Sequence, residues 1–209
     1  MVISLPDMQA LAATCAPTVA AETLLSVAKV ESGFNPLAIG VNGTPRITVR
    51  ATSVVDAAAK AAALIAQGRS IDLGLAQINS RSLAWLGLTV EAAFDPCRNL
   101  AASARVLQDG YERAQPKAAG EQAALRTALS FYNTGHPQRG LRNGYVAKVA
   151  NAAARIVPAL QPALEGAVEE PVAAAPAPVQ PSWDVFGQTA EPASFVIRVS
   201  APDHKGGQE

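Results

Sequence analysis

A change of composition near Pro158 limits where this 209-residue chain can build a hydrophobic core. From Pro158 onward, eight prolines fall within about fifty residues and alternate with alanine, valine and glutamate. Proline has no backbone N–H to donate, and a stretch of this kind buries too little apolar surface to offset its conformational entropy. We therefore predict a folded domain over residues 1–160 and a Pro/Ala-rich, acidic, disordered tail over residues 161–209.

The folded part is predicted to be mainly α-helical. The chain contains 44 alanines, so much of its apolar content is small and helix-favouring rather than β-branched. Thr18, Ser53 and Asn143 are candidate helix N-caps, and Asp95-Pro96 combines a cap with a first-turn proline. Gly40, Asn42-Gly43 and the alternation in Arg46–Arg50 predict a short β-hairpin. The expected helices cover residues 19–31, 53–67, 95–115, 120–132 and 144–157, and the hairpin lies within residues 37–51.

Charge and hydropathy exclude some partners. Seventeen basic residues balance seventeen acidic ones, which argues against a dedicated nucleic-acid-binding surface. No run approaches the roughly 20 apolar residues that a transmembrane helix needs. The N-terminus has no Lys or Arg before Lys29 and is interrupted by Pro6, so no export signal is evident in this chain.

Two cysteines, Cys15 and Cys97, lack the spacing of a metal site. Two interpretations stay open for them. In an oxidising compartment, a disulfide would close a loop of about 80 residues and stabilise the fold by roughly 4 kcal/mol in the chain-entropy treatment. Otherwise they are two buried thiols.

Glu31 is the first candidate for chemistry. It ends a predicted apolar helix, where the negative pole of the helix dipole disfavours another negative charge. Partial burial beside Phe34 would raise its pKa further and keep a proton available for a leaving group. The alternative, from position alone, is an exposed glutamate at a helix end.

Three further stretches carry hydrogen-bonding or aromatic side chains beside glycines. The stretch Asp72–Asn79 offers the amides of Gln77 and Asn79, which suit hydroxyl and N-acetyl groups. The stretches Phe131–Gly135 and Asn143–Val146 each contain a tyrosine and an asparagine. Singly, each has an ordinary structural interpretation, such as a helix C-cap or a packed aromatic.

Together and in this order, the four stretches resemble the lytic transglycosylases with a goose-type-lysozyme-like (SLT) catalytic domain. The resemblance covers roughly residues 8–157, and the stretch from Cys15 to Cys97 is similar to the transglycosylase subunits of VirB-class type IV secretion systems. The matching motifs are Glu31-Ser32 for the E-S motif, Gly74-Leu75-Ala76-Gln77 with Asn79 for G-L-x-Q, Tyr132-Asn133-Thr134-Gly135 for Y-N-x-G, and Tyr145-Val146 for Y-V.

The resemblance implies a lysozyme-like fold and an enzyme, a lyase acting on polysaccharide. Members of the family cleave the β-1,4 bond between N-acetylmuramic acid and N-acetylglucosamine in peptidoglycan and leave 1,6-anhydro ends. Carried over, Glu31 acts first as acid and then as base. The C6 hydroxyl of the sugar attacks, so one carboxyl suffices, whereas most glycoside hydrolases need two. No metal or organic cofactor is required.

The same resemblance assigns substrate-binding positions. Ser32 would orient Glu31, and Tyr145 would hydrogen-bond Glu31 or the substrate. N-acetyl and hydroxyl groups would be held by the strip Gly74, Leu75, Gln77 and Asn79 together with Tyr132 and Asn133. The implied setting is periplasmic, where the enzyme opens the wall for a secretion or conjugation apparatus. For the tail, three interpretations stay open: it tethers the domain, it binds other subunits of that apparatus, or it is cut away.

Two alternatives stay open. Asp72 precedes Gly74 by two residues, and its carboxylate would either cap the following turn or activate water in a hydrolytic muramidase. The domain would otherwise be a non-catalytic glycan-binding scaffold whose tail recruits partners.

Overall fold

The computed structural model of this protein describes residues 2–43 and 47–160. The predicted disordered tail at 161–209 therefore lies outside the described residues. Eight α-helices are described: α1 (Leu5–Cys15), α2 (Ala21–Ser32), α3 (Val54–Ala66), α4 (Leu83–Leu86), α5 (Pro96–Ala114), α6 (Glu121–Thr134), α7 (Arg139–Arg142) and α8 (Tyr145–Leu160). Short 3₁₀ turns lie at Ser80–Ser82, Ala92–Phe94 and Gln115–Lys117.

A small antiparallel sheet accompanies the helices. Its strands are β1 (Ile39–Val41), β2 (Ile47–Val49), β3 (Ile71–Leu73) and β4 (Ile78–Asn79), in the order β2-β1-β3-β4. The predicted hairpin is confirmed as β1 and β2, with Ile39 opposite Val49. The other two strands were not predicted, because strands of three and two residues are too short to show an alternating pattern.

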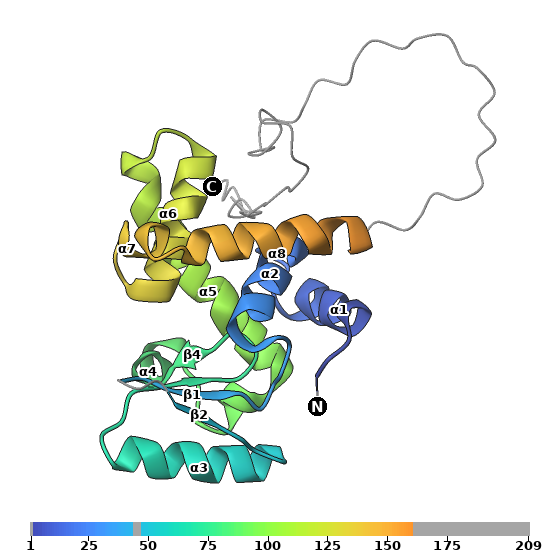
Figure 1. The fold of residues 1–209 in the computed structure, drawn as a ribbon, viewed down its shortest axis with the longest axis vertical. Coiled ribbons are helices and arrows are strands. Elements are labelled where there is room, and N and C mark those ends of the chain that lie inside the picture. Colours follow the sequence, from blue (N-terminus) through green and yellow to red (C-terminus); the bar gives the residue numbers. More distant parts are fainter. Residues whose placement is uncertain (1, 44–46, 161–209) are drawn as a thin grey trace, which may run out of the picture.

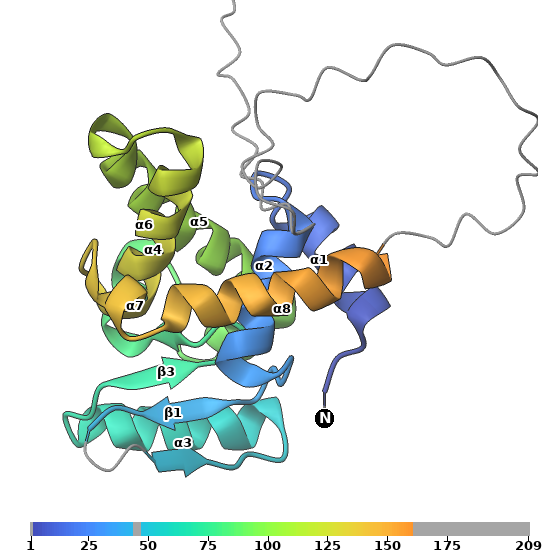
Figure 2. The same cartoon turned by 45° about the horizontal axis from the view of Figure 1, so that its top comes forward.

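The described chain has two hydrophobic cores, one on each side of the candidate motifs. The helical core is built from α1, α2, α5, α6 and α8, with Leu24, Leu25 and Leu107 fully buried. The second core joins the sheet to α3 through Ile39, Ile71 and Leu73. Figures 1 and 2 show this division: α3 and the sheet lie below, and α8 crosses α2 above them.

Side-chain caps mark the starts of three of the described α-helices, α1, α3 and α5. Ser53 and Asp95 are N-caps as predicted: Ser53 Oγ accepts the backbone N–H of Asp56, and Asp95 Oδ1 accepts that of Arg98. The prediction for Thr18 is wrong. The helix starts later, at Ala21, and its N-cap Ala20 offers no side-chain hydrogen bond, because residues 17–18 form a turn before it.

Helix α1 was not predicted, although its start carries a capping signal. Ser4 Oγ accepts the backbone N–H of Asp7, and Pro6 lies in the first turn. At the other end of the described chain, α8 continues through Pro158 to Leu160, the last residue described. Pro158 has no N–H to donate to the carbonyl of Ala154, so the last turn of α8 lacks this hydrogen bond.

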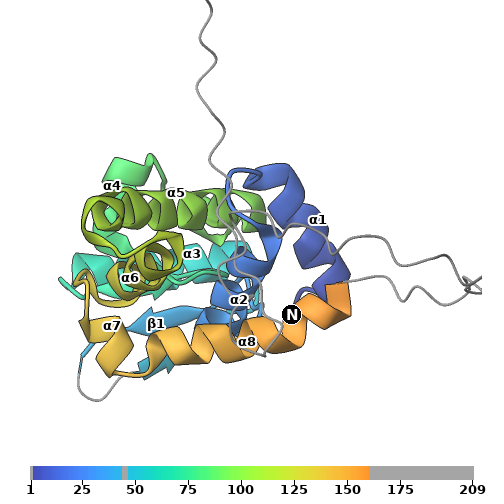
Figure 3. The same cartoon turned by 90° about the horizontal axis from the view of Figure 1, so that it is seen from above.

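A disulfide joins Cys15, the last residue of α1, to Cys97 in the first turn of α5, with the two Cα atoms 5.3 Å apart. Of the two interpretations that the sequence left open, the structure has the disulfide. Figure 3 shows α1 lying against the start of α5, and the contacts between these two helices agree. Among the described helices, none is both long enough and apolar enough to span a bilayer.

Candidate active site

Glu31 lies in the last turn of α2, half-buried between the two cores. The helix ends at Gly33, which adopts a left-handed conformation with φ of +63°. Phe34 follows with φ of +70°, which is unusual for a residue with a side chain, and its ring is only 6% exposed. This turn directs the chain from the helix into β1 and leaves Glu31 facing the space between the two cores.

Tyr145 holds the Glu31 carboxyl from the opposite helix. At the start of α8, its hydroxyl donates to Glu31 Oε1 at 2.6 Å. Burial, and next the nearby charge of Glu31, raise the pKa of Tyr145 well above its ordinary value. The phenol therefore stays protonated and remains a donor. Asn143 Oδ1 accepts the backbone N–H of Tyr145 and anchors this end of α8.

Ser32 connects the end of α2 to the glycine-containing loop before β4. Its hydroxyl donates to the carbonyl oxygen of Leu75 at 2.7 Å and accepts the backbone N–H of Asn35 at 3.1 Å. The Ser32 hydroxyl therefore makes its hydrogen bonds within the protein. These bonds position the end of α2, beside Glu31, against the 74–77 loop.

The loop at residues 74–77 is packed from behind by a buried asparagine of α5. Asn99 is fully buried, and its Nδ2 donates to the carbonyls of Leu73 (2.9 Å) and Ala93 (2.7 Å), while its Oδ1 accepts the N–H of Ala76 at 2.8 Å. Gly74 has φ of +75°, and a Cβ there would overlap Asn99 and the Ala93 carbonyl. Gly74 and the fully buried Leu75 therefore shape the loop and do not line the clefts described below.

Gln77 is the residue that this loop presents to the site. It adopts φ of +50°, and its Nε2 donates to the carbonyls of Ala38 (3.2 Å) and Gly74 (3.0 Å). These two bonds fix the carboxamide. Within residues 2–43 and 47–160, no hydrogen bond to its Oε1 is described, so this oxygen is positioned to accept an N–H or O–H donor from a ligand.

Asn79 and Asp72 are tied together across β3 and β4. Asn79 Nδ2 donates to Asp72 Oδ1 at 2.7 Å and to Ser70 Oγ at 3.1 Å, and its Oδ1 accepts the N–H of Arg81. Both ends of the Asn79 amide are therefore engaged within the protein. Asp72 contacts the neighbouring strand through this bond, which is neither of the two roles that the sequence left open for it.

Tyr132 and Asn133 end α6 on the helical side of the site. The Tyr132 hydroxyl donates to the carbonyl of Ala76 at 2.7 Å and lies 3.1 Å from Ser103 Oγ. Burial, and then the charge of Glu31, raise the pKa of Tyr132 far above its ordinary value, so it too stays a donor. Asn133 is exposed, and its Oδ1 accepts Nδ2 of Asn143 at 2.9 Å.

Two clefts meet at Glu31. The larger, about 530 Å³, is lined by Glu31, Asp72, Asn79 and Tyr132, among others. The smaller, about 450 Å³, is lined by Glu31, Ser32 and Tyr145, and reaches Thr48 on β2. Glu31, Gln77 and Asn133 line both. A chain-like ligand can therefore cross Glu31 and extend to either side, as a polymer cut in its interior must.

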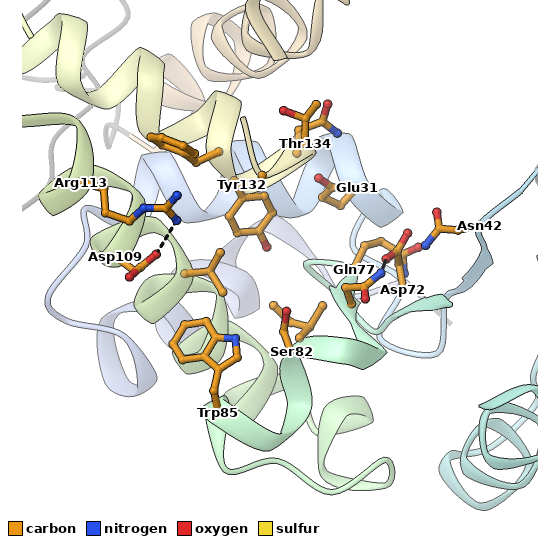
Figure 4. A pocket seen from close by; sticks show the side chains of 16 residues that line it. Glu31, Asn42, Asp72, Gln77, Ser82, Trp85, Asp109, Arg113, Tyr132 and Thr134 are labelled. Carbon is orange, nitrogen blue, oxygen red and sulfur yellow. Dashed lines mark hydrogen bonds and ion pairs between the residues drawn. The ribbon is translucent and has the colours of Figure 1, made fainter. Parts of the chain in front are cut away.

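Figure 4 shows how the larger cleft is arranged. Glu31, Gln77, Asp72 and Asn42 lie on one side of Tyr132, and Asp109, Arg113 and Trp85 lie on the other. Within the part of the chain that the structure describes, no group of three or more His, Cys, Asp or Glu side chains is arranged to hold a metal ion.

Sequence reasoning missed Trp85, Asp109 and Arg113. Trp85 is 47% exposed and lines the larger cleft, and its rarity was an available signal because the chain has two tryptophans. Asp109 and Arg113 are four residues apart on α5, the spacing of an ordinary surface ion pair, so the sequence alone carries no signal that they face a cleft.

Comparison with known proteins agrees with the motif pattern. Residues 8–153 match the family described as the transglycosylase SLT domain. Similar curated proteins are "Protein virB1" of Agrobacterium fabrum (38% identity, covering 88% of this chain and 72% of the relative) and "Type IV secretion system protein virB1" of Brucella abortus (44%, covering 68% and 62%). "Protein virB1" of Rhizobium radiobacter is 44% identical, covering 76% of this chain and 65% of the relative. The chain thus spans less than two thirds of the latter two. No solved structure gives a significant match.

Proposed function

Because the chain belongs to the transglycosylase SLT domain family, we propose that it is a peptidoglycan lytic transglycosylase that cleaves the β-1,4 bond between N-acetylmuramic acid and N-acetylglucosamine. The observation that carries this proposal is the position of Glu31. This carboxyl lies where two clefts meet, hydrogen-bonded by a tyrosine that burial keeps protonated. One carboxyl at the junction of two ligand sites is what an acid acting on an interior glycosidic bond requires.

The reaction follows from one acid and the chemistry of the sugar. Protonated Glu31 donates its proton to the glycosidic oxygen, and the bond from that oxygen to C1 of N-acetylmuramic acid breaks. The carboxylate then accepts the proton of the C6 hydroxyl, whose oxygen forms the new bond to C1. The products are a free 4-hydroxyl and a 1,6-anhydro end. No water is consumed, and Glu31 ends protonated.

The surrounding residues divide into binding and positioning groups. Gln77 offers its carboxamide oxygen to an N–H or hydroxyl donor of the glycan, and Asn133 lies exposed in both clefts. Tyr145, Ser32 and Tyr132 act through hydrogen bonds that hold Glu31 and the 74–77 loop. Gly74, Leu75 and Asn79 shape and support this loop and the adjoining strands.

The names of the relatives support a cellular setting for this proposal. One is called a type IV secretion system protein and covers 68% of this chain. We assign the enzyme to the periplasm, where it opens a local gap in the wall for such an apparatus. The domain occupies residues 1–160, and the tail at 161–209 is the part that binds other subunits.

The test is the mass of the product. Wild-type protein should release muropeptides with anhydro ends, which are lighter by one water than reducing ends, and Glu31→Gln should release none while still binding glycan. In cells, Glu31→Gln should abolish secretion or conjugation that depends on this protein. A scaffold would keep its cellular role with this substitution, so full complementation by Glu31→Gln would refute an enzyme.

One observation favours a second candidate, hydrolysis. Asp72 lines the same cleft as Glu31, and in Figure 4 its carboxylate lies on the same side of Tyr132 as Glu31. A water-activating base would give reducing ends instead of anhydro ends. Reducing-end products that disappear in Asp72→Asn would establish the hydrolase, whereas anhydro products that persist in Asp72→Asn would exclude it.

A further inference from the structure

The far end of the larger cleft carries an ion pair with no part in the bond cleavage described above. Arg113 Nη1 donates to Asp109 Oδ2 at 3.2 Å, and both side chains are 53% exposed. Both residues line the cleft that contains Glu31. In Figure 4 the pair lies across Tyr132 from Glu31, at some remove from the reacting bond.

The guanidinium of Arg113 is oriented by two contacts. Its central carbon lies 4.2 Å from the centroid of the Phe131 ring, and Asp109 is four residues before it on the same helix. A guanidinium has five N–H donors, and in the described residues one of them has a protein acceptor. A stacked, oriented guanidinium with free donors is well suited to a carboxylate, which it can bind in bidentate fashion.

The sugar rings of the glycan carry no carboxylate of their own for such a site. Their N-acetyl and hydroxyl groups are uncharged, so a carboxylate in this cleft comes either from the stem peptide on N-acetylmuramic acid or from a lactyl group whose peptide has been removed. The negative charge of Asp109 favours the stem peptide over the lactyl group as the source of the carboxylate. A pair of opposite charges complements a peptide that carries both an ammonium and a carboxylate, whereas the lactyl group offers a carboxylate alone and would be repelled by Asp109.

We propose that Arg113, oriented by Phe131 and Asp109, binds a carboxylate of the stem peptide, and that this end of the cleft selects peptide-bearing glycan. The proposal rests on the proposed function, because it takes peptidoglycan as the ligand. Arg113 is a specificity residue and makes no contact with the scissile bond, so its loss should alter substrate preference and leave the chemical step intact.

The experiment compares three ligands: peptide-bearing glycan strands, the same strands after an amidase has removed the peptides, and a neutral N-acetylglucosamine oligomer. Arg113→Met should raise KM for peptide-bearing strands by about threefold to fivefold, the size expected for a half-exposed charged hydrogen bond after solvent screening, with kcat unchanged. It should leave KM for amidase-treated strands and affinity for the neutral oligomer as they are. Arg113→Lys should recover part of the loss. Arg126→Met is the matched control, since Arg126 is exposed on α6 and lines neither cleft.

Each outcome has a defined meaning. An equal rise in KM for amidase-treated strands would assign the lactyl carboxylate and overturn the peptide assignment. No change for any ligand, or an equal loss for all three, would overturn the carboxylate site altogether. Affinities measured in the Glu31→Gln background separate this proposal from the proposed function, because they do not depend on turnover. Wild-type protein that releases no anhydro product would refute the function while leaving the binding comparison intact.

Discussion

Asn99 supports the loop that carries Gln77, and its removal should cost both stability and activity. Asn99→Ala takes away the partners of three backbone groups: the N–H of Ala76 and the carbonyls of Leu73 and Ala93. The side chain is fully buried, so water does not replace these bonds freely. At about 1 kcal/mol each, the loss is about 3 kcal/mol in the free energy of unfolding.

Urea unfolding measures this loss directly. With a denaturant slope of about 2 kcal/mol per molar, the midpoint should fall by about 1.5 M. Asn151→Ala is the matched control, because Asn151 is exposed on α8 and alanine is a better helix former, so its midpoint should stay or rise slightly. At temperatures where Asn99→Ala is still folded, kcat/KM should also fall, because Gln77 is no longer fixed.

A loss of less than about 1 kcal/mol with an unchanged denaturant slope would refute the reasoning for Asn99. It would mean that the three backbone groups find other partners without it. A loss of stability with unchanged kcat/KM would separate the two claims, since the loop would then hold Gln77 by other contacts.

Three more measurements test the structure. Replacing Cys15 and Cys97 by serine opens an 82-residue loop and should lower the free energy of unfolding by about 4.5 kcal/mol in the chain-entropy treatment; equal midpoints in oxidising and reducing buffer would contradict this. Thr23→Val should raise stability by about 1 kcal/mol, because among the described residues the buried Thr23 Oγ1 has no hydrogen-bond partner, and a calorimetric Tm below wild type would count against it. Burial raises the pKa of Tyr145 above its ordinary 10.0, so above about pH 10 the unfolded chain loses this proton before the folded one and stability falls as pH rises; in alkaline unfolding experiments Tyr145→Phe should lose stability less steeply than wild type.

The sequence predicted the parts of the fold that local interactions determine. Ser53 and Asp95 cap helices through bonds to residues three positions away, and the β1–β2 hairpin pairs two strands that are close together in the sequence. Thr18 failed because an equally good local signal was followed by a turn. A cap residue shows only that a helix can begin there, and packing determines where it does.

The motifs of the candidate site could be predicted from the sequence, whereas the residues that pack behind and beside them could not. Glu31, Gln77 and Tyr145 come from three stretches that the sequence singled out. The structure places Glu31 and Gln77 in both clefts and Tyr145 in the smaller one. Asn99 could not be recognised, because an asparagine in a helix looks the same in sequence whether it is buried or exposed. The same limit applies to Arg113, whose stacking on Phe131 depends on how α5 packs against α6.

The covalent link between Cys15 and Cys97 determines in what order the site can be taken apart. The ring that it closes contains α2, the sheet and the 74–77 loop, and so encloses Glu31 and Gln77, while Tyr132 and Tyr145 lie on the chain beyond it. A protease or an unfolding machine that starts from the C-terminus removes the two tyrosines first and meets the closed ring only afterwards. Such an attack would inactivate the enzyme while Glu31 and the 74–77 loop were still held together in the disulfide-linked fragment.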